Sequence, residues 1–229
     1  MRQSFEMNCC ICKSNLIGEV FKSHYKCGKC HHIFVDYKGD GVLYHKKEYR
    51  NNSHGLRDAQ EISNGKITDL FHAKRNGVCD KRIKLIKNFL SQSSSVLDIG
   101  AGGGTFARKL LDYGMKVDCQ EVSDICIDHL IESSFNVYKG DFCQIDIPNK
   151  YDIVTAWHVL EHVKDPYSFI KKYSSICSKF LIMEVPINRS FKKLENEWDG
   201  HYHLFSKKSL RLICNNFFEE VLITEEGVQ

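Results

Sequence analysis

The stretch TAWHVLEHVKDP, residues 155–166, brings three residues with functional side chains close together. His158, Glu161 and His162 can bind a metal ion, relay a proton or pack as ordinary side chains. Histidine has an unperturbed pKa of about 6.5, so it can take up a proton near neutral pH. His158 and His162 lie four residues apart, which would place them on one face of a helical turn. The role of the stretch therefore depends on the elements that position it.

Two cysteine pairs near the N-terminus have the spacing of a zinc site. Cys9 and Cys12 form one Cys-x-x-Cys pair, and Cys27 and Cys30 form a second. Each pair can present two thiolates from one tight turn, and four thiolates make the tetrahedral set that structural zinc favours. Reduced thiols without a metal are the alternative interpretation. Three nearby side chains are possible substitutes in the ligand set: Cys10, His31 and His32.

A glycine-rich loop occurs at residues 95–111, SVLDIGAGGGTFARKLL, which begin as a buried strand and end as an amphipathic helix. Gly100, Gly102 and Gly104 fall at the turn, where glycine lets the backbone approach a ligand and helix N–H groups point toward it. Asp98 lies two residues before the first glycine. Thr105 occupies the place of the third glycine of a dinucleotide-binding fingerprint.

Polar or aromatic residues also follow the next two predicted strands. Glu121 closes the strand KVDCQEV, where a carboxylate can accept hydrogen bonds from both hydroxyls of a ribose. The sequence KGDF places Asp141 and Phe142 after the following strand, where they suit the amino group and ring face of an adenine. Together these residues suit a ligand that contains adenosine.

Strand and helix patterns alternate from about Asp80 onward. The first helix, DKRIKLIKNFL, places four apolar residues on one face: Ile83, Ile86, Phe89 and Leu90. Strands are predicted at 95–100, 116–122, 135–140, 151–157 and 179–185, and helices near Gly104, Ser123, Asp165 and Ser206. Alternation of this kind predicts an α/β fold with a doubly wound, mostly parallel sheet covered on both faces.

The chain from about Asp80 to the end resembles the class I S-adenosylmethionine-dependent methyltransferases, which have a Rossmann-like fold. LDIGAGGG, CQEVS, KGDF, YDIVTAWHVLEHVKDP and FLIMEVPI match that family's motifs in order and spacing. The resemblance implies S-adenosylmethionine as cofactor and S-adenosylhomocysteine as product. An unrelated doubly wound fold whose glycines only make turns is the alternative. The cofactor-binding residues implied are Asp98, Gly100, Gly102, Gly104, Glu121, Val122, Asp141, Phe142, Ala156 and Trp157.

This resemblance also gives the histidines a predicted role. His158 follows the fourth strand, at the sheet edge that faces the transferable methyl group in this family, and a hydroxyl acceptor must lose a proton there. His158 is therefore predicted as a general base or acceptor-binding residue, or else as part of the cofactor pocket. His201 and His203 are further catalytic candidates, in a loop of about residues 186–205 that is predicted to cover the acceptor. Their alternation predicts that both side chains point the same way, and hydrogen bonding within the loop is their alternative role.

Glu161 and His162 belong to the LEHV block, which is common in this superfamily. Some relatives, including ubiquinone-pathway O-methyltransferases and small-RNA methyltransferases, use a Glu-x-x-Glu-His version to bind a divalent metal. His158 replaces the first acid here. We therefore expect Glu161 and His162 to be local structural supports, with a second metal as the alternative.

The cysteine pairs resemble the zinc ribbon of a methyltransferase subgroup, several members of which act on nucleotide-linked sugars or surface-glycan precursors. The predicted domains are a ribbon at 1–35, a connector or lid with short helices at 36–79 and a methyltransferase domain at 80–229. The sugar C-methyltransferases of that subgroup have a further C-terminal domain, which we do not expect in this chain, so O- or N-methylation is expected before C-methylation. Residues 218–226, FEEVLITEE, are expected to add a sixth strand, without the family's seventh.

Composition limits the class of protein and its partners. The 229 residues are 42% hydrophobic and 27% charged, as in globular proteins. No apolar run approaches the roughly 18 residues of a membrane span, and the N-terminus lacks the apolar segment of a signal peptide. We therefore expect a cytoplasmic protein with reduced cysteines and a small, sugar-containing acceptor. The sequence does not predict an oligomeric state.

Two other functions are open. One is an RNA methyltransferase whose ribbon grips the nucleic acid, but a net charge of +3 is small for that partner. The other is a non-catalytic zinc-ribbon interaction module on a degenerate transferase fold. The intact cofactor motifs argue against the second.

Overall fold

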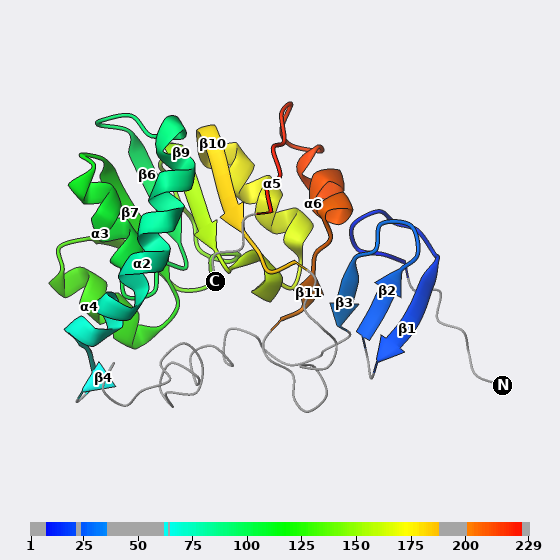
Figure 1. Ribbon diagram of the computed structural model, residues 1–229, viewed down its shortest axis with the longest axis horizontal. Coiled ribbons are helices and arrows are strands. Elements are labelled where there is room, and N and C mark those ends of the chain that lie inside the picture. Colours follow the sequence, from blue (N-terminus) through cyan, green and yellow to red (C-terminus); the bar gives the residue numbers. More distant parts are fainter. Residues whose placement is uncertain (1–7, 22–23, 36–61, 64, 188–200, 226–229) are drawn as a thin grey trace. The chain divides into compact units, whose positions relative to one another are not determined.

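The computed structural model describes residues 8–21, 24–35, 62–63, 65–187 and 201–225 (Figure 1). The chain divides into two compact units, and each is described by itself. One unit contains Met1–Gly41, His158–Ser174 and Glu184–Glu225, and the other contains Val42–Trp157, Ser175–Met183 and Glu226–Gln229. Most of the predicted connector and much of the predicted loop at 186–205 lie outside the described residues.

The second unit is built on a five-stranded sheet with the order β10-β9-β6-β7-β8 (Figure 1). β6 pairs in parallel with β7 and β9, and β7 pairs in parallel with β8. The predicted Rossmann-like parallel sheet is confirmed, since all five strands form where the apolar runs placed them. They are β6 (Ser95–Ile99), β7 (Lys116–Glu121), β8 (Asn136–Lys139), β9 (Tyr151–Trp157) and β10 (Cys177–Glu184).

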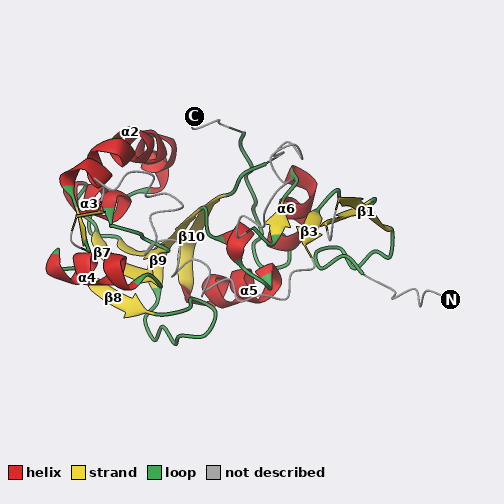
Figure 2. Ribbon diagram, turned by 90° about the horizontal axis from the view of Figure 1, so that it is seen from below, coloured by secondary structure: helices red, strands yellow, loops and turns green. Residues whose placement is uncertain are grey.

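Helices α2 (Asp69–Ile86), α3 (Thr105–Asp112) and α4 (Asp124–Glu132) accompany this sheet (Figure 2). α3 packs on β7, α4 packs on β7 and β8, and α2 packs on α3. Leu110 of α3 and Leu130 of α4 are fully buried. Burial of side chains of this size stabilises the unit by about 1.5–3 kcal/mol each. Shorter elements are a hairpin of β4 (Ile62–Ser63) and β5 (Lys66–Ile67), and the turn η1 (Lys87–Phe89).

The first helix is longer than the pattern predicted. α2 begins at Asp69, and it buries Phe71 and Cys79 in addition to Ile83 and Ile86. Gly77 and the polar residues around it hide this first half, because glycine is a poor helix former and breaks the apolar period. Phe89, predicted on the buried face, lies in η1 with 38% of its surface exposed.

The predicted sixth strand is wrong for the described residues. Residues 218–225 follow α6 (Lys207–Cys214) without forming a strand, and Leu222 is 79% exposed. Valine, isoleucine and threonine favour strands because they pack well on a half-buried sheet surface. Where a segment has no such surface, as Leu222 shows, this preference does not produce a strand.

The first unit contains a four-stranded antiparallel sheet with the order β1-β2-β3-β11 (Figure 1). Its ribbon strands are β1 (Ile17–Phe21), β2 (His24–Cys27) and β3 (Ile33–Val35), and β11 (His203–Leu204) comes from far along the chain. The sequence did not predict β11. The unit also holds the turn η2 (Leu160–His162), most of α5 (Pro166–Ile176) and α6. Among the described residues, no helix has the length and apolar character that crossing a membrane requires.

Candidate functional site

The glycine loop joins β6 to α3 in a backbone conformation that residues other than glycine rarely adopt. Gly100, Gly102 and Gly104 have φ values of 64°, 56° and 77°, in the left-handed region open to glycine. A Cβ on Gly104 would lie 2.6 Å from Cδ2 of Leu130, so close packing also requires glycine there. The loop therefore has no side chains at these three positions, and Gly100 at its start is exposed, so a ligand can approach the backbone there.

Glu121 is 3% exposed at the end of β7 and is bonded to the loop. Its Oε2 accepts the N–H of Gly102 at 2.7 Å, and its Oε1 accepts those of Val122 and Ser123 at 2.7 and 2.8 Å. Burial raises the pKa of Glu121, and these three N–H groups oppose that rise. A carboxylate offers about four lone-pair positions, and these three bonds leave about one, on Oε2, to accept a ribose hydroxyl.

Gln120 is a site residue that the sequence analysis missed. Its side chain is fully buried, its Oε1 accepts the N–H of Gly100 at 3.1 Å, and its Nε2 donates to the carbonyl of Gly140 at 2.6 Å. It thereby ties the loops after β6 and β8 to the strand between them. Its place in β7 directly before Glu121 was the available signal, since an amide buried there needs partners.

Asp98 is buried inside the sheet, with 1% exposure. Its Oδ1 accepts the Thr155 hydroxyl at 2.7 Å, which links β6 to β9. Burial raises the pKa of Asp98 to about 7, and the Thr155 hydrogen bond opposes this. Thr155 was not predicted as a site residue. The contact of Asp98 with a cofactor stays a prediction.

The remaining predicted cofactor residues are held by local contacts. Oδ1 of Asp141 accepts the N–H of Cys143 at 2.8 Å, which shapes the turn after β8. Trp157 ends β9, where Phe106 meets its ring edge-on with centroids 4.9 Å apart. Contacts of a cofactor with Val122, Asp141, Phe142, Ala156 and Trp157 stay predictions.

His158, directly after β9, is bonded at both ring nitrogens. Nδ1 lies 3.1 Å from Oε1 of Glu161, and Nε2 lies 3.0 Å from Oε1 of Glu184. These hydrogen bonds to the two carboxylates, the one to Glu161 more than the one to Glu184, raise the pKa of His158 to about 9. A general base needs a free lone pair, whereas this arrangement favours an imidazolium that donates to both carboxylates. The base role of His158 stays a prediction that this geometry does not favour. Glu184 was missed because the sequence gives no sign that it meets His158.

We expect the ring of His158 to remain protonated up to a pH of about 9. The folded-state pKa lies above the ordinary value of about 6.5. The protonated ring therefore stabilises the folded state fully below pH 6.5. This contribution to stability is lost as the pH rises through the folded-state pKa of about 9. A proton NMR titration of the histidine rings measures this.

Glu184→Gln should lower the pKa of His158, because one of its two carboxylates becomes a neutral amide. Glu132→Gln is the matched control, since Glu132 pairs instead with Lys66 at 3.1 Å. A wild-type pKa at or below 6.5 would contradict the ion-paired arrangement.

Glu161 is the centre of a histidine cluster in the first unit. Its side chain is fully buried, and Oε2 has no hydrogen-bond partner among the described residues. Nε2 of His162 and Nε2 of His201 lie 4.0 and 3.9 Å from its Oε1, and the two rings stack with centroids 4.5 Å apart. Burial alone would raise the pKa of Glu161, but its bond to His158 and the charge of His162 lower it. These three ligand atoms lie within 4.8 Å of one another, so they could hold a cation, and the second metal stays a prediction.

His203 does not join that cluster. Its Nδ1 lies 3.0 Å from Nε2 of His32 in the ribbon, and its Nε2 donates to the carbonyl of Lys164 at 3.4 Å. Burial lowers the pKa of His203 to about 4. His201 and His203, predicted to point the same way, thus have different partners, and only His201 lies near Glu161. A catalytic role for either histidine stays a prediction.

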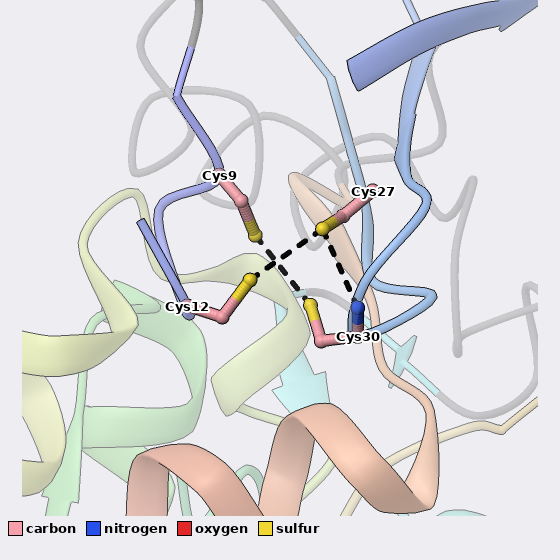
Figure 3. Close-up of side chains that lie close together, drawn as sticks. All are labelled: Cys9, Cys12, Cys27 and Cys30. Atoms are coloured by element: carbon pink, nitrogen blue, oxygen red, sulfur yellow. Dashed lines mark hydrogen bonds between the residues drawn. The ribbon is translucent and has the colours of Figure 1, made fainter. Parts of the chain in front are cut away.

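The four predicted zinc ligands converge from two turns (Figure 3). The sulfurs of Cys9 and Cys30 are 3.6 Å apart, those of Cys12 and Cys27 are 3.5 Å apart, and all four lie within 4.8 Å of one another. Zinc–sulfur bonds of about 2.3 Å in a tetrahedron place sulfurs about 3.8 Å apart, so this set fits one zinc ion. Of the possible substitutes, His31 is exposed, and Cys10 groups with His32 and His203.

Comparison with known proteins agrees with this fold. Residues 71–217 match a family model described as a methyltransferase domain. The chain belongs to this methyltransferase family. A ubiquinone biosynthesis O-methyltransferase of Coxiella burnetii (strain Dugway 5J108-111) is 32% identical over 122 residues, 48% of this chain and 51% of the relative. The enzyme of the same description from Nitrosospira multiformis is 30% identical over 105 residues, 42% and 41% of the two chains. The chain thus spans about half the length of the curated relatives it matches, or less.

A solved structure shows the same fold. The magnesium protoporphyrin IX methyltransferase of Synechocystis PCC 6803, with bound S-adenosylhomocysteine, aligns with a TM-score of 0.58 and 16% identity. The alignment covers 77% of this chain and 88% of that one. The predicted class I methyltransferase fold is confirmed, whereas these relatives do not support the predicted similarity to sugar and glycan methyltransferases.

Proposed function

We propose that this chain transfers a methyl group from S-adenosylmethionine to a hydroxyl of a small molecule. The observation that carries the proposal is the bonding of Glu121 to the glycine loop, which places a buried carboxylate beside the half-buried backbone of Gly102. A carboxylate fixed there can hold a ribose while the loop receives the rest of the cofactor. The bound cofactor supplies an electrophilic methyl group on its sulfonium.

A hydroxyl is the favoured acceptor because both relatives described above are named O-methyltransferases. Their names refer to ubiquinone biosynthesis, so an aromatic hydroxyl is one candidate acceptor. The sugar hydroxyl predicted from the cysteine ribbon is the other. Methylation of nitrogen, carbon or RNA has no support from these names.

Proton removal would fall to His201 rather than His158. His158 is held between two carboxylates, and its raised pKa of about 9 favours the protonated ring. Nε2 of His201 lies 3.9 Å from Oε1 of Glu161, which can stabilise the imidazolium formed when His201 takes up a proton. His158 would then orient the acceptor or hold Glu161 in place.

The four ribbon cysteines would hold a structural zinc ion. The spacing of their sulfurs supports this, and closed four-sulfur sites serve folding rather than catalysis. The set leaves no open coordination position, so the metal would take no part in methyl transfer.

Methyl transfer from labelled S-adenosylmethionine tests the proposal directly. The probes are protocatechuate for an aromatic hydroxyl, UDP-glucose for a sugar hydroxyl, ethanolamine for an amine, and a single-stranded RNA. We expect calorimetric binding of S-adenosylhomocysteine and labelled product from a hydroxyl probe alone. Absence of cofactor binding would refute the proposal, and label found only on ethanolamine or RNA would overturn the acceptor assignment.

A further inference from the structure

The short strand β11 extends the ribbon sheet with residues that follow the fifth strand of the transferase sheet. His203 pairs with Phe34 and Leu204 pairs with Ile33, so β11 lies along the outer edge of β3 (Figure 1). One residue earlier, the carbonyl of Tyr202 accepts the N–H of Val35 at 3.0 Å. The ribbon therefore fixes the backbone of the segment 201–206.

Side chains strengthen this attachment next to the second cysteine pair. Nε2 of His32 lies 3.0 Å from Nδ1 of His203, and the Ser206 hydroxyl donates to the carbonyl of Cys30 at 2.7 Å. The ring of His32 also packs on Phe205, with centroids 4.9 Å apart. His32 and Phe205 are almost fully buried, so these contacts exclude water.

The same segment touches the Glu161 cluster. The N–H of Tyr202 donates to the carbonyl of Glu161 at 2.8 Å, and the ring of His201 stacks on that of His162. The segment 201–206 thus contacts the ribbon through Tyr202, His203 and Ser206. It contacts the Glu161 cluster through His201 and Tyr202. A displacement of β11 from β3 would move His201 and release the backbone of Glu161.

The order of the ribbon would depend on the proposed zinc ion. Three strands of three to five residues each have little apolar core, and in such small modules the metal supplies much of the folding free energy. We propose that the metal-loaded ribbon is the positioning element for Glu161 and His201, acting through β11. This inference rests on the proposed function, since it takes the zinc site and the histidine cluster as parts of one methyltransferase.

Removing the contact between His32 and His203 in the full chain tests this coupling. His203→Phe keeps a ring but loses both hydrogen bonds. We expect the amide of Tyr202 to exchange with solvent at least about tenfold faster, because opening of β11 frees it. We also expect the pKa of His158 to fall, because Glu161 moves away. Affinity for S-adenosylhomocysteine should stay within about twofold, since the variant changes no predicted cofactor residue. His203→Gln, which can donate and accept, should restore both readouts.

A second pair of variants tests the same coupling in case the His203 variants do not fold. Ser206→Ala removes the bond to Cys30 and also the N-cap of α6, whose Ser206 hydroxyl accepts the N–H of Ser209 at 3.0 Å. Ser209→Ala is the control, because it disturbs the same capping box and leaves the Cys30 bond intact. We expect faster Tyr202 exchange in Ser206→Ala and not in Ser209→Ala.

Withdrawal of zinc from the wild type with a chelator should reproduce both changes, and zinc addition should reverse them. Unchanged Tyr202 exchange and an unchanged pKa of His158 in both the His203 and Ser206 variants would overturn the inference. Equal acceleration of Tyr202 exchange by Ser206→Ala and Ser209→Ala would overturn the inference as well. A wild type that contains no zinc contradicts the proposed metal site instead, and lost cofactor affinity in the wild type contradicts the proposed methyl transfer.

Discussion

Replacing Glu121 with alanine should weaken the binding of S-adenosylhomocysteine by about one to two decades. The carboxylate is 3% exposed and accepts the N–H of Gly102, so it fixes the loop and keeps about one lone-pair position on Oε2 for the proposed ribose. Hydrogen bonds to a charged group contribute about 1.5–3 kcal/mol, and 1.4 kcal/mol corresponds to tenfold in affinity. Isothermal titration calorimetry with the purified chain measures the change.

Asp118→Asn is the control for this measurement. Asp118 lies on the same strand, and its carboxylate accepts the Tyr151 hydroxyl at 2.6 Å, so the change removes a charge from β7 without touching the loop. Thermal unfolding of both variants separates loss of binding from loss of fold. A Glu121→Ala protein that is folded and binds as tightly as the wild type would show that this carboxylate holds no ribose.

Replacing Cys27 with serine should remove the metal and disorder the ribbon. The Cys27 sulfur lies 3.5 Å from that of Cys12, and serine provides a weaker, harder ligand than the thiolate that zinc prefers. Structural zinc binding contributes apparent free energies of about 10–16 kcal/mol in zinc-finger peptides, so loss of the ion should exceed the effect of most single substitutions. Elemental analysis should find one zinc per wild-type chain and little in the variant.

Cys10→Ser is the matched change, because Cys10 adjoins the first cysteine pair and lies outside the set of four sulfurs. It should retain the zinc. Retention of zinc by Cys27→Ser together with its loss from Cys10→Ser would show that the ligand set includes Cys10 in place of Cys27. A wild type purified without chelator that holds no zinc would refute the site.

Local sequence patterns predicted the parts of the molecule that depend on neighbouring residues. β9 forms at the predicted residues because YDIVTAW is mostly apolar, as a strand that is largely buried on both faces requires. Gly104 was identifiable because its place between a strand and a helix demands a residue without a Cβ. The convergence of Cys9 with Cys30 followed from two short spacings that each make one turn.

Contacts between segments that are far apart in the chain could not be predicted from local sequence patterns. β11 has two residues and β3 has three, which is too few for an alternation of apolar and polar residues to appear in the sequence. The hydrogen bond from His158 to the Glu184 carboxylate depends on where β9 and β10 end relative to each other. At residues 218–225 a strand was predicted that does not form. The residues there favour strands, but the exposure of Leu222 shows that the segment has no sheet surface to pack on.

The pairing of β11 with β3 has a consequence for the newly synthesised chain. His32 and His203 are 171 positions apart, yet they lie side by side in the finished fold. At about 5–20 residues per second, translation needs roughly 10–30 s to pass from one to the other. During that interval the ribbon can take up its metal and pair β1, β2 and β3, but the outer edge of β3 has no β11 to cover it. An open strand edge invites pairing with other chains. The nascent protein is therefore most exposed to aggregation at its earliest folded part, and synthesis of residues 203 and 204 ends that exposure.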